Sequence, residues 1–359
     1  MRLECVSIRL GILAIRIRLI YMKGEGLKLV LVHLGPKSAP HLWKNLDYLQ
    51  EQFEGFDLTL IVDHPKNISR AKRRKINYWI YKPSSQTEIA FQDSAHNLNF
   101  RHGFWRYSLE RFMAISNFHQ TQPSTQILHI ESDILILPNI DPSVFKSPQL
   151  TWMKFNDTHD VGAVMFTPSA AESKWLADSM IELLRQDKGL TDMTILKRLR
   201  DSHPGRTNTY PCFIEDVGEI IFDAAPIGMW LTGEDPRNHT GWCVLHRELP
   251  ESVLRPEKLD FVLDSQGLRV VHNKSITKQV MTLHVHSKEV KLFGRNSEKT
   301  LANYVNLSSN KQLLRKFVLR KYFAVIFDYA TRNNLLLFST WRKIAARFIG
   351  NRGNLPKQN

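Results

Sequence analysis

The sequence lacks the features that mark several protein classes. Its three cysteines, Cys5, Cys212 and Cys243, match neither a disulfide framework nor the ligand spacing of a zinc site. Only 17 glycines and 16 prolines occur in 359 residues, which excludes collagen-like and low-complexity chains. No apolar run approaches the roughly 20 residues that span a bilayer, so no standard transmembrane helix is expected. These absences indicate a soluble globular protein of a reducing compartment.

The net positive charge is concentrated at the two ends of the chain. Residues 1–24 carry five basic residues and one acid, and residues 311–359 carry eleven basic residues and one acid. These ends hold the whole net charge of +14, so residues 25–310 are formally neutral. A nucleic-acid enzyme normally carries its basic surface on the working domain. We therefore expect no nucleic-acid partner, and we interpret the internal cluster 72–75 as a solvated helix or loop face.

The C-terminal segment combines this charge with apolar residues at helical spacing. Leu337, Trp341, Ile344 and Phe348 recur at that spacing, and basic residues occupy other positions of the same helix. Such a helix suits an anionic membrane surface, which predicts a peripheral protein at the inner face of the plasma membrane. The alternative is a helical cap packed on the domain with a solvated basic face. At the other end, residues 1–21 are either part of the protein or an extension upstream of Met22.

Between these ends, short apolar runs alternate with amphipathic helices. Strands are predicted at 27–32, 58–62, 127–130 and 134–137, and helices at 41–53 and 104–118. This alternation predicts an α/β domain whose sheet is mostly parallel, and ligands of such sheets bind beyond the carboxyl ends of the strands. The expected division is a basic arm at 1–24, a domain at 25–295 and a helical tail at 296–359.

An acidic triplet, Glu131-Ser132-Asp133, directly follows the predicted strand 127–130. Two unpaired carboxylates buried side by side would cost several kcal/mol, and a hard divalent cation such as Mn²⁺ or Mg²⁺ would remove that cost. The alternative is a solvent-facing acidic turn.

A second segment, 281–288, has strand-like alternation that places His284 and His286 on one face. Imidazole ligates Mn²⁺-type ions, and Lys288 can meet a phosphate as a point charge. The alternative is a half-exposed strand with two hydrogen-bonded histidines.

Together the triplet and the His-x-His-Ser-Lys segment resemble the GT-A class of nucleotide-sugar glycosyltransferases. In that class a D-x-D-type motif follows a central strand, and a C-terminal histidine often completes the metal site. The segments 104–112, 161–166 and 190–194 resemble the helix before the motif, the strand after it and a later acidic position. The segments 222–230 and 233–238 resemble a region of bacterial surface-polysaccharide transferases.

The resemblance implies a GT-A (Rossmann-like) fold and a metal site made by Glu131, Asp133 and a histidine. His286 is preferred because it lies nearer the strand end, and His284 is the alternate. The sequence departs from the class at Glu131, which replaces the first aspartate, and in lacking a His-x-x-Gly-x-x-Lys-Pro-Trp ending.

Further residues are assigned to donor binding and to catalysis. His33 and Gly35 after the first strand and Asp63 after the second are the expected nucleotide contacts. Cationic groups that would stabilise the departing diphosphate are Arg106, Arg111 and Lys288. An inverting enzyme also needs a carboxylate base, for which the candidates are Asp223 first, then Asp192 and Asp216.

We therefore expect a metal-dependent, hexosyltransferase-type glycosyltransferase of either stereochemical outcome. It would move a sugar from a UDP- or GDP-linked donor to a surface glycan or lipid-linked acceptor in polysaccharide biosynthesis. One alternative is a non-catalytic peripheral protein that binds membranes or nucleic acid through its ends. The other is a sugar nucleotidyltransferase, against which the missing Gly-rich phosphate loop counts.

Overall fold

The structure is a computed structural model of the full chain. It describes residues 27–37, 39–53, 57–92, 95–96, 99–138, 140–233, 254, 256–294 and 296–309. The predicted basic arm 1–24, residues 234–238 and the part of the predicted tail from residue 310 onward lie outside the described residues.

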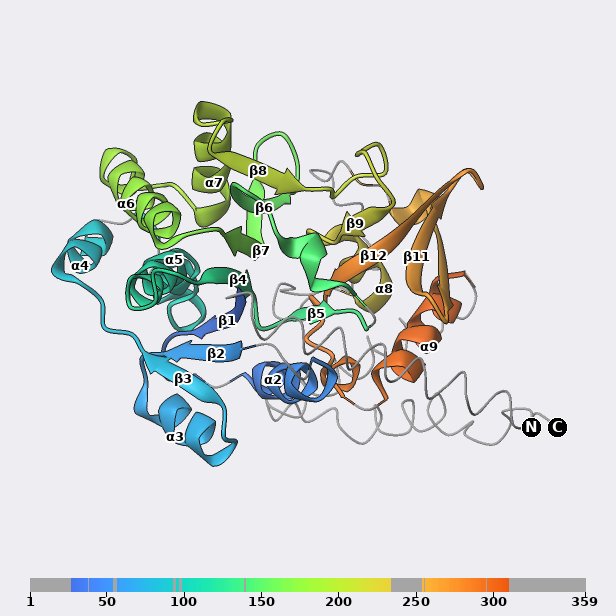
Figure 1. Ribbon diagram of the computed structural model, residues 1–359, viewed down its shortest axis with the longest axis horizontal. Coiled ribbons are helices and arrows are strands. Elements are labelled where there is room, and N and C mark those ends of the chain that lie inside the picture. Colours follow the sequence, from blue (N-terminus) through green and yellow to red (C-terminus); the bar gives the residue numbers. More distant parts are fainter. Residues whose placement is uncertain are drawn as a thin grey trace, which may run out of the picture.

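A seven-stranded sheet forms the centre of the molecule (Figure 1). Its strands, in spatial order, are β3 (Asn77–Ile80), β2 (Asp57–Val62), β1 (Leu27–His33), β4 (Gln126–Ile130), β7 (Asp160–Thr167), β6 (Leu150–Lys154) and β8 (Thr207–Tyr210). All neighbours pair in parallel except β7, which runs antiparallel to both β4 and β6. The expected mixed α/β architecture with a mostly parallel sheet is therefore confirmed.

Helices cover both faces of this sheet because its central strands are apolar on both sides. In β1, Leu29 and Leu31 belong to one core, while Val30 between them belongs to the other. The first core includes α2 (Pro40–Gln52) and Ala71 of α3 (Pro65–Arg73). The second core includes the helices α4 (Ser85–Gln92), α5 (Phe104–Gln120), α6 (Ala170–Gln186) and α7 (Asp192–Ser202).

Local sequence signals fix where several of these helices begin. A proline occupies the first turn of α2 and of α3, where a missing backbone N–H costs no hydrogen bond. The Ser169 side chain accepts a hydrogen bond from the Glu172 amide at the start of α6. At the start of α7, Thr191 and Thr194 form a reciprocal capping box. This cap places Asp192 in the first turn of α7, facing the end of β4.

A second sheet packs beside the first and is built mainly from the C-terminal part of the described chain (Figure 1). Its order is β10 (Asp260–Asp264), β11 (Gly267–His272), β12 (Ile276–His284) and β5 (Ile134–Ile136), and β9 (Ile220–Phe222) pairs with β12 in parallel. Two helices accompany it, α8 (Pro226–Thr232) and α9 (Ser297–Ser309). Because β4 and β5 are separated by only residues 131–133, this short segment joins the two sheets.

The remaining short helices are single 3₁₀ turns: η1 (Phe100–His102), η2 (Pro142–Phe145), η4 (Pro256–Lys258) and η5 (Val290–Leu292). Within the ranges given above, no helix combines the length and the apolar character needed to cross a bilayer.

Candidate functional site

The acidic triplet lies in the segment that joins the two sheets. The Glu131 amide donates to the Ala163 carbonyl of β7 at 2.8 Å, which fixes the end of β4. The Asn45 side chain of α2 donates to the carbonyls of Ser132 (3.1 Å) and Ile134 (2.8 Å). The loop is therefore held from both sides, so the two carboxylates have a defined position at the carboxyl end of the central strand.

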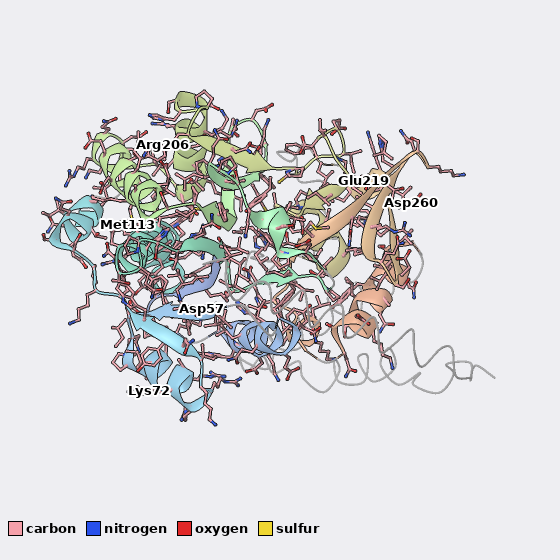
Figure 2. The ribbon with its side chains drawn as sticks, viewed as in Figure 1. Asp57, Lys72, Met113, Arg206, Glu219 and Asp260 are labelled. Carbon is pink, nitrogen blue, oxygen red and sulfur yellow. The ribbon has the colours of Figure 1, made fainter. Side chains whose placement is uncertain are left out.

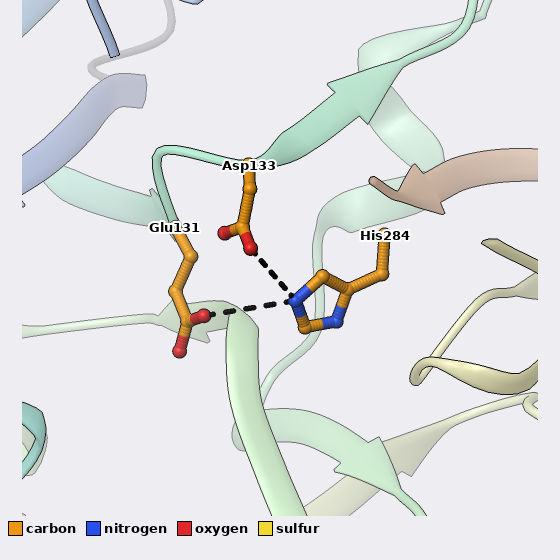
Figure 3. Close-up of side chains that lie close together, drawn as sticks. All are labelled: Glu131, Asp133 and His284. Atoms are coloured by element: carbon orange, nitrogen blue, oxygen red, sulfur yellow. Dashed lines mark hydrogen bonds and ion pairs between the residues drawn. The ribbon is translucent and has the colours of Figure 1, made fainter. Parts of the chain in front are cut away.

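Strand β12 brings a histidine to these carboxylates. His284 pairs with Ile134 at the end of β12, and the Val285 amide donates to the Asp133 carbonyl at 2.8 Å. As a result, His284 Nε2 lies 3.2 Å from Asp133 Oδ2 and 3.9 Å from Glu131 Oε2 (Figure 3). One ligand atom from each of the three residues lies within 4.8 Å of the others. Two carboxylates and an imidazole are a suitable ligand set for Mn²⁺, and the carboxylates also suit Mg²⁺.

The histidine in this group is His284, the alternate, and not His286, which the sequence favoured. Strand β12 ends at His284, and the His286 amide then turns back to the His284 carbonyl at 2.8 Å. The His286 ring packs on the His284 ring, with 4.2 Å between centroids. The strand ends two residues before His286, so the group with the carboxylates contains His284.

Two cationic side chains complete the cluster. The Lys288 ammonium forms an ion pair with Asp133, and the Arg111 guanidinium of α5 contacts both Glu131 and Asp192, at 2.8 Å from Asp192 Oδ2. All of these side chains are buried or mostly buried. Arg111 therefore joins the acidic triplet to the later acid Asp192 across the start of α7.

The charges of this cluster shift one another's pKa values. Burial would raise the pKa of Asp133, but the Lys288 ammonium and the His284 imidazole outweigh burial and hold it well below its usual value. Burial would lower the pKa of His284, but Asp133 and Glu131 raise it above the usual value. The pKa of Asp192 is raised by burial, which the charge of Arg111 only partly offsets. Asp133 thus stays an anion that attracts cations, the property that a metal ligand needs.

Asp223, the first candidate for a catalytic base, has a different environment. It is fully buried, and its two oxygens accept hydrogen bonds from four backbone amides: Ala225 (3.0 Å), Ile227 (3.0 Å), Gly228 (2.7 Å) and His284 (2.9 Å). These hydrogen bonds join the start of α8 to the end of β12. They occupy both carboxylate oxygens, so neither is open to an acceptor hydroxyl. Asp216, the third candidate, likewise accepts from the amides of Cys212 (2.7 Å) and Phe213 (2.9 Å).

The close approach of α8 to β12 depends on Gly228. A Cβ atom at this position would lie 1.9 Å from the His284 carbonyl oxygen, so any larger residue would push the two elements apart. The position of His284 is therefore set by Asp223 and Gly228 together.

The expected nucleotide contacts gather at the neighbouring strand ends. The Gly35 amide donates to Asp63 Oδ1 at 2.8 Å, and Asn67 of α3 donates to the Gly35 carbonyl at 2.9 Å. The ring of Tyr107 lies against Gly35 so closely that a Cβ atom there would be 2.5 Å from it. His33 lies at the end of β1, where its Nε2 contacts the Lys37 carbonyl at 2.7 Å.

Arg106, another expected donor contact, is engaged in ion pairs with two glutamates. Its guanidinium contacts the buried Glu110 at 2.7 Å and Glu88 of α4 at 2.6 Å, and it lies over the Phe91 ring. These contacts join α4 to α5, so the structure engages Arg106 in helix packing.

Three residues of the site were not identified from the sequence: His41, Asn45 and Tyr107. His41 Nε2 lies 3.2 Å from the Ser132 hydroxyl, and Asn45 holds the loop as described above. Asn45 did carry a signal, because it is a polar residue on the apolar face of its helix, three positions after Leu42.

No family model matches the chain, and no curated protein matches it. Among solved structures, it is similar to PaToxG glycosyltransferase at 11% identity, over 54% of this chain and 78% of that one, with a TM-score of 0.34. It is similar to the glycosyltransferase GlyE of Streptococcus pneumoniae TIGR4 at 12% identity, over 52% of this chain and 45% of that one (TM-score 0.34). It therefore spans less than half of GlyE.

A third similar structure is an active-site mutant of LgtC, at 11% identity over 77% of this chain and 95% of that one (TM-score 0.39). Two of these three similar structures are of glycosyltransferases.

Proposed function

We propose that this protein is a metal-dependent glycosyltransferase that uses a nucleoside-diphosphate sugar. The observation that carries the proposal is the convergence of Glu131, Asp133 and His284 from the two sheets, at the carboxyl end of the central strand. Ligands of such sheets bind at that edge. Mn²⁺ or Mg²⁺ held there would neutralise negative charge on the diphosphate leaving group.

The chain's own cations support the same chemistry. Lys288 and Arg111 lie beside the carboxylates, and each can donate to phosphate oxygens, so they would stabilise the charge that develops as the diphosphate departs. Because Lys288 is already paired with Asp133, a divalent ion would compete with it for the same carboxylate. We infer that the ammonium turns to the diphosphate when the ion is bound.

The donor's nucleoside would lie over the ends of β1 and β2. There, Gly35, Asp63 and Tyr107 offer a close backbone, a carboxylate and an aromatic ring within one small region. Asp192, fixed by Arg111, is the acid that we assign to the hydroxyls of the donor sugar. Since Asp223 and Asp216 are engaged by backbone amides, we assign neither the role of catalytic base.

The acceptor that we propose is a surface glycan or a lipid-linked sugar, as in polysaccharide biosynthesis at the inner face of a plasma membrane. The predicted tail that would reach this membrane lies largely outside the described residues. The acceptor proposal therefore depends on the motifs quoted from 222–230 and on the charge of the chain ends.

Calorimetric titration of UDP and of GDP tests the proposal, with Mn²⁺ and with chelator. Wild-type protein should bind one of the two nucleotides only with metal. Asp133→Ala and His284→Ala should lose that binding, and they should also lose binding of Mn²⁺ alone, followed by the Mn²⁺ spin-resonance signal. Asp178→Ala, which removes an exposed acid of α6, is the matched control. Binding of either nucleotide that persists in both site variants would contradict the proposed site.

A further inference from the structure

The outer side of α3 carries a dense group of basic residues. Six lie between positions 66 and 75, and no Asp or Glu occurs anywhere from residue 64 to residue 87. We call this group the α3 basic face; its members are Lys66, Arg70, Lys72, Arg73, Arg74 and Lys75. Lys66, Lys72, Arg73 and Lys75 are exposed, and Arg70 and Arg74 are half-buried. In Figure 2, Lys72 lies at the edge of the molecule that α3 forms.

Few acids neutralise this face. Within the part of the chain that the structure describes, Arg74 pairs with Asp47 of α2, whereas Lys66, Lys72, Arg73 and Lys75 form no ion pair. The arginines crowd one another: partial burial, then the charges of Arg74 and Arg73, lower the pKa of Arg70, against the opposing effect of Asp47. Because these positive charges repel one another, the approach of an anionic partner stabilises the surface.

The arginines of the face are also held in place by aromatic rings. The Arg70 and Arg74 guanidinium carbons lie 4.7 Å and 5.9 Å from the centre of the Trp43 ring. Lys72 Nζ lies 6.0 Å from the centre of the Tyr78 ring on β3. Stacking uses the flat side of a guanidinium, and its N–H donors point outward from the edge, where they suit phosphate oxygens. Cations fixed in this way lose less entropy on binding than free side chains.

An exposed apolar side chain lies on β3, the strand that packs against α3. β3 is the edge strand of the large sheet, and its last residue, Ile80, is 44% exposed. Basic residues near an exposed aliphatic side chain match the boundary between lipid headgroups and acyl chains. A nucleic acid would use the charge but not the aliphatic group.

We propose that the α3 basic face docks the protein on an anionic lipid bilayer. The four exposed cations, at about 1 kcal/mol each near such a surface, are sufficient for reversible attachment. The opposite side of α3 presents buried Asn67, which donates to the Gly35 carbonyl in the loop of the proposed nucleotide site. Docking through this helix thus holds the mouth of the candidate site beside the membrane. This last step rests on the proposed function, whereas the docking itself does not.

The test measures sedimentation of the full chain with vesicles of phosphatidylcholine, alone or with 30 mol% phosphatidylglycerol, at about 0.1 M salt. A triple variant, Lys72→Gln with Arg73→Gln and Lys75→Gln, removes three exposed charges of the face. The matched control, Lys174→Gln with Arg185→Gln and Lys188→Gln, removes two charges of α6 and one just after it, and α6 covers the other face of the sheet.

We expect wild type and control to bind the anionic vesicles alike, and the α3 variant to bind at least about tenfold more weakly. Equal binding by all three proteins would overturn the proposal. So would a variant that keeps its vesicle affinity but loses affinity for a labelled 20-nucleotide RNA, since the face would then be a nucleic-acid surface. Thermal unfolding checks that the variants fold, and Lys66→Gln with Arg73→Gln repeats the test should the triple variant unfold.

The outcome is separable from that of the proposed function. The α3 variant should bind Mn²⁺ and nucleotide like wild type, and Asp133→Ala should bind vesicles like wild type. Failure of one experiment therefore leaves the other intact.

Discussion

Two buried aspartates at strand ends, Asp133 after β4 and Asp223 after β9, both contact His284 but are stabilised in different ways. The partners of Asp133 are side chains, Lys288 and the His284 imidazole, which can rotate away. The partners of Asp223 are four backbone amides, which cannot leave without moving α8 or β12. A carboxylate with exchangeable partners can accept a ligand, whereas one with fixed partners determines the shape of the site.

The largest effect expected from this difference is on folding. Asp223→Asn would turn an amide group toward backbone donors and leave some of them buried without an acceptor. We expect the free energy of unfolding to fall by about 3 kcal/mol, measured by urea unfolding. Asp178→Asn, at an exposed site on α6, should change it by less than about 0.5 kcal/mol. A loss below about 1 kcal/mol for Asp223→Asn would show that the amides find other partners.

At Asp133 we expect a large effect on ligand binding and a small effect on folding. Asp133→Asn should weaken metal-dependent nucleotide binding by about 100-fold, since it removes the charge of the central ligand. Its effect on unfolding should be less than about half that of Asp223→Asn, because Lys288 can turn to water. Titration calorimetry and urea unfolding measure the two quantities. If Asp133→Asn proves the more damaging to folding, the distinction between the two aspartates fails.

His129 lies on β4, the strand that Glu131 directly follows, and it extends the comparison to pH. Its Nδ1 donates to the Val30 carbonyl at 3.0 Å, and burial, reinforced by the charge of Arg111, lowers its pKa from 6.5 to about 3. The unfolded chain therefore binds a proton below pH 6.5 that the folded chain does not, so stability falls as the pH falls.

Between pH 7.5 and pH 5 this group should reduce the free energy of unfolding by about 2 kcal/mol. Urea unfolding at both pH values measures this loss, and His129→Gln should show a loss smaller by that amount. Identical pH dependence in the two proteins would mean that another group is responsible.

The smallest effect concerns Lys288, and its sign is the informative part. Lys288→Gln removes the ammonium that competes with a metal for Asp133, so Mn²⁺ alone should bind about threefold more tightly. Nucleotide with Mn²⁺ should bind about tenfold more weakly, because a cation that meets the diphosphate is lost. Lys291→Gln, an exposed neighbour, should change neither affinity. If both affinities change in the same direction, the proposed contact between Lys288 and the diphosphate is wrong.

The apolar runs predicted three strands of the first sheet, β1, β2 and β4, and the helices α2 and α5 within one or two residues. The predicted strand 58–62 and helix 41–53 correspond to β2 and α2. Both were predictable because a buried strand leaves a short apolar run in the sequence and an amphipathic helix leaves apolar residues at helical spacing. The acidic triplet was singled out because two carboxylates directly after an apolar strand would be costly to bury without a cation. Periodicity contains no information on which distant segments pair, so the second sheet was not predicted.

The same limit explains why the sequence favoured His286 over His284. His284 and His286 would lie on the same face of an ideal strand. Which of them reaches the carboxylates depends on where β12 ends in its pairing with β5. Arg106 and Arg111 lie five residues apart on one helix, yet only Arg111 contacts Glu131 and Asp192. Arg106 instead pairs with Glu88 of α4 and with Glu110 one turn along its own helix. The sequence alone does not tell which acids each arginine meets.

The segment that joins the two sheets has a consequence for how the protein is made. Asp133 meets His284 and Lys288 from 151 and 155 residues away along the chain. A ribosome that has completed β8 has supplied every strand of the large sheet, yet Asp133 still lacks His284 and Lys288. Contacts of such long range form late in folding. The newborn protein should therefore acquire its framework first and its affinity for cations last, when β12 docks on β5.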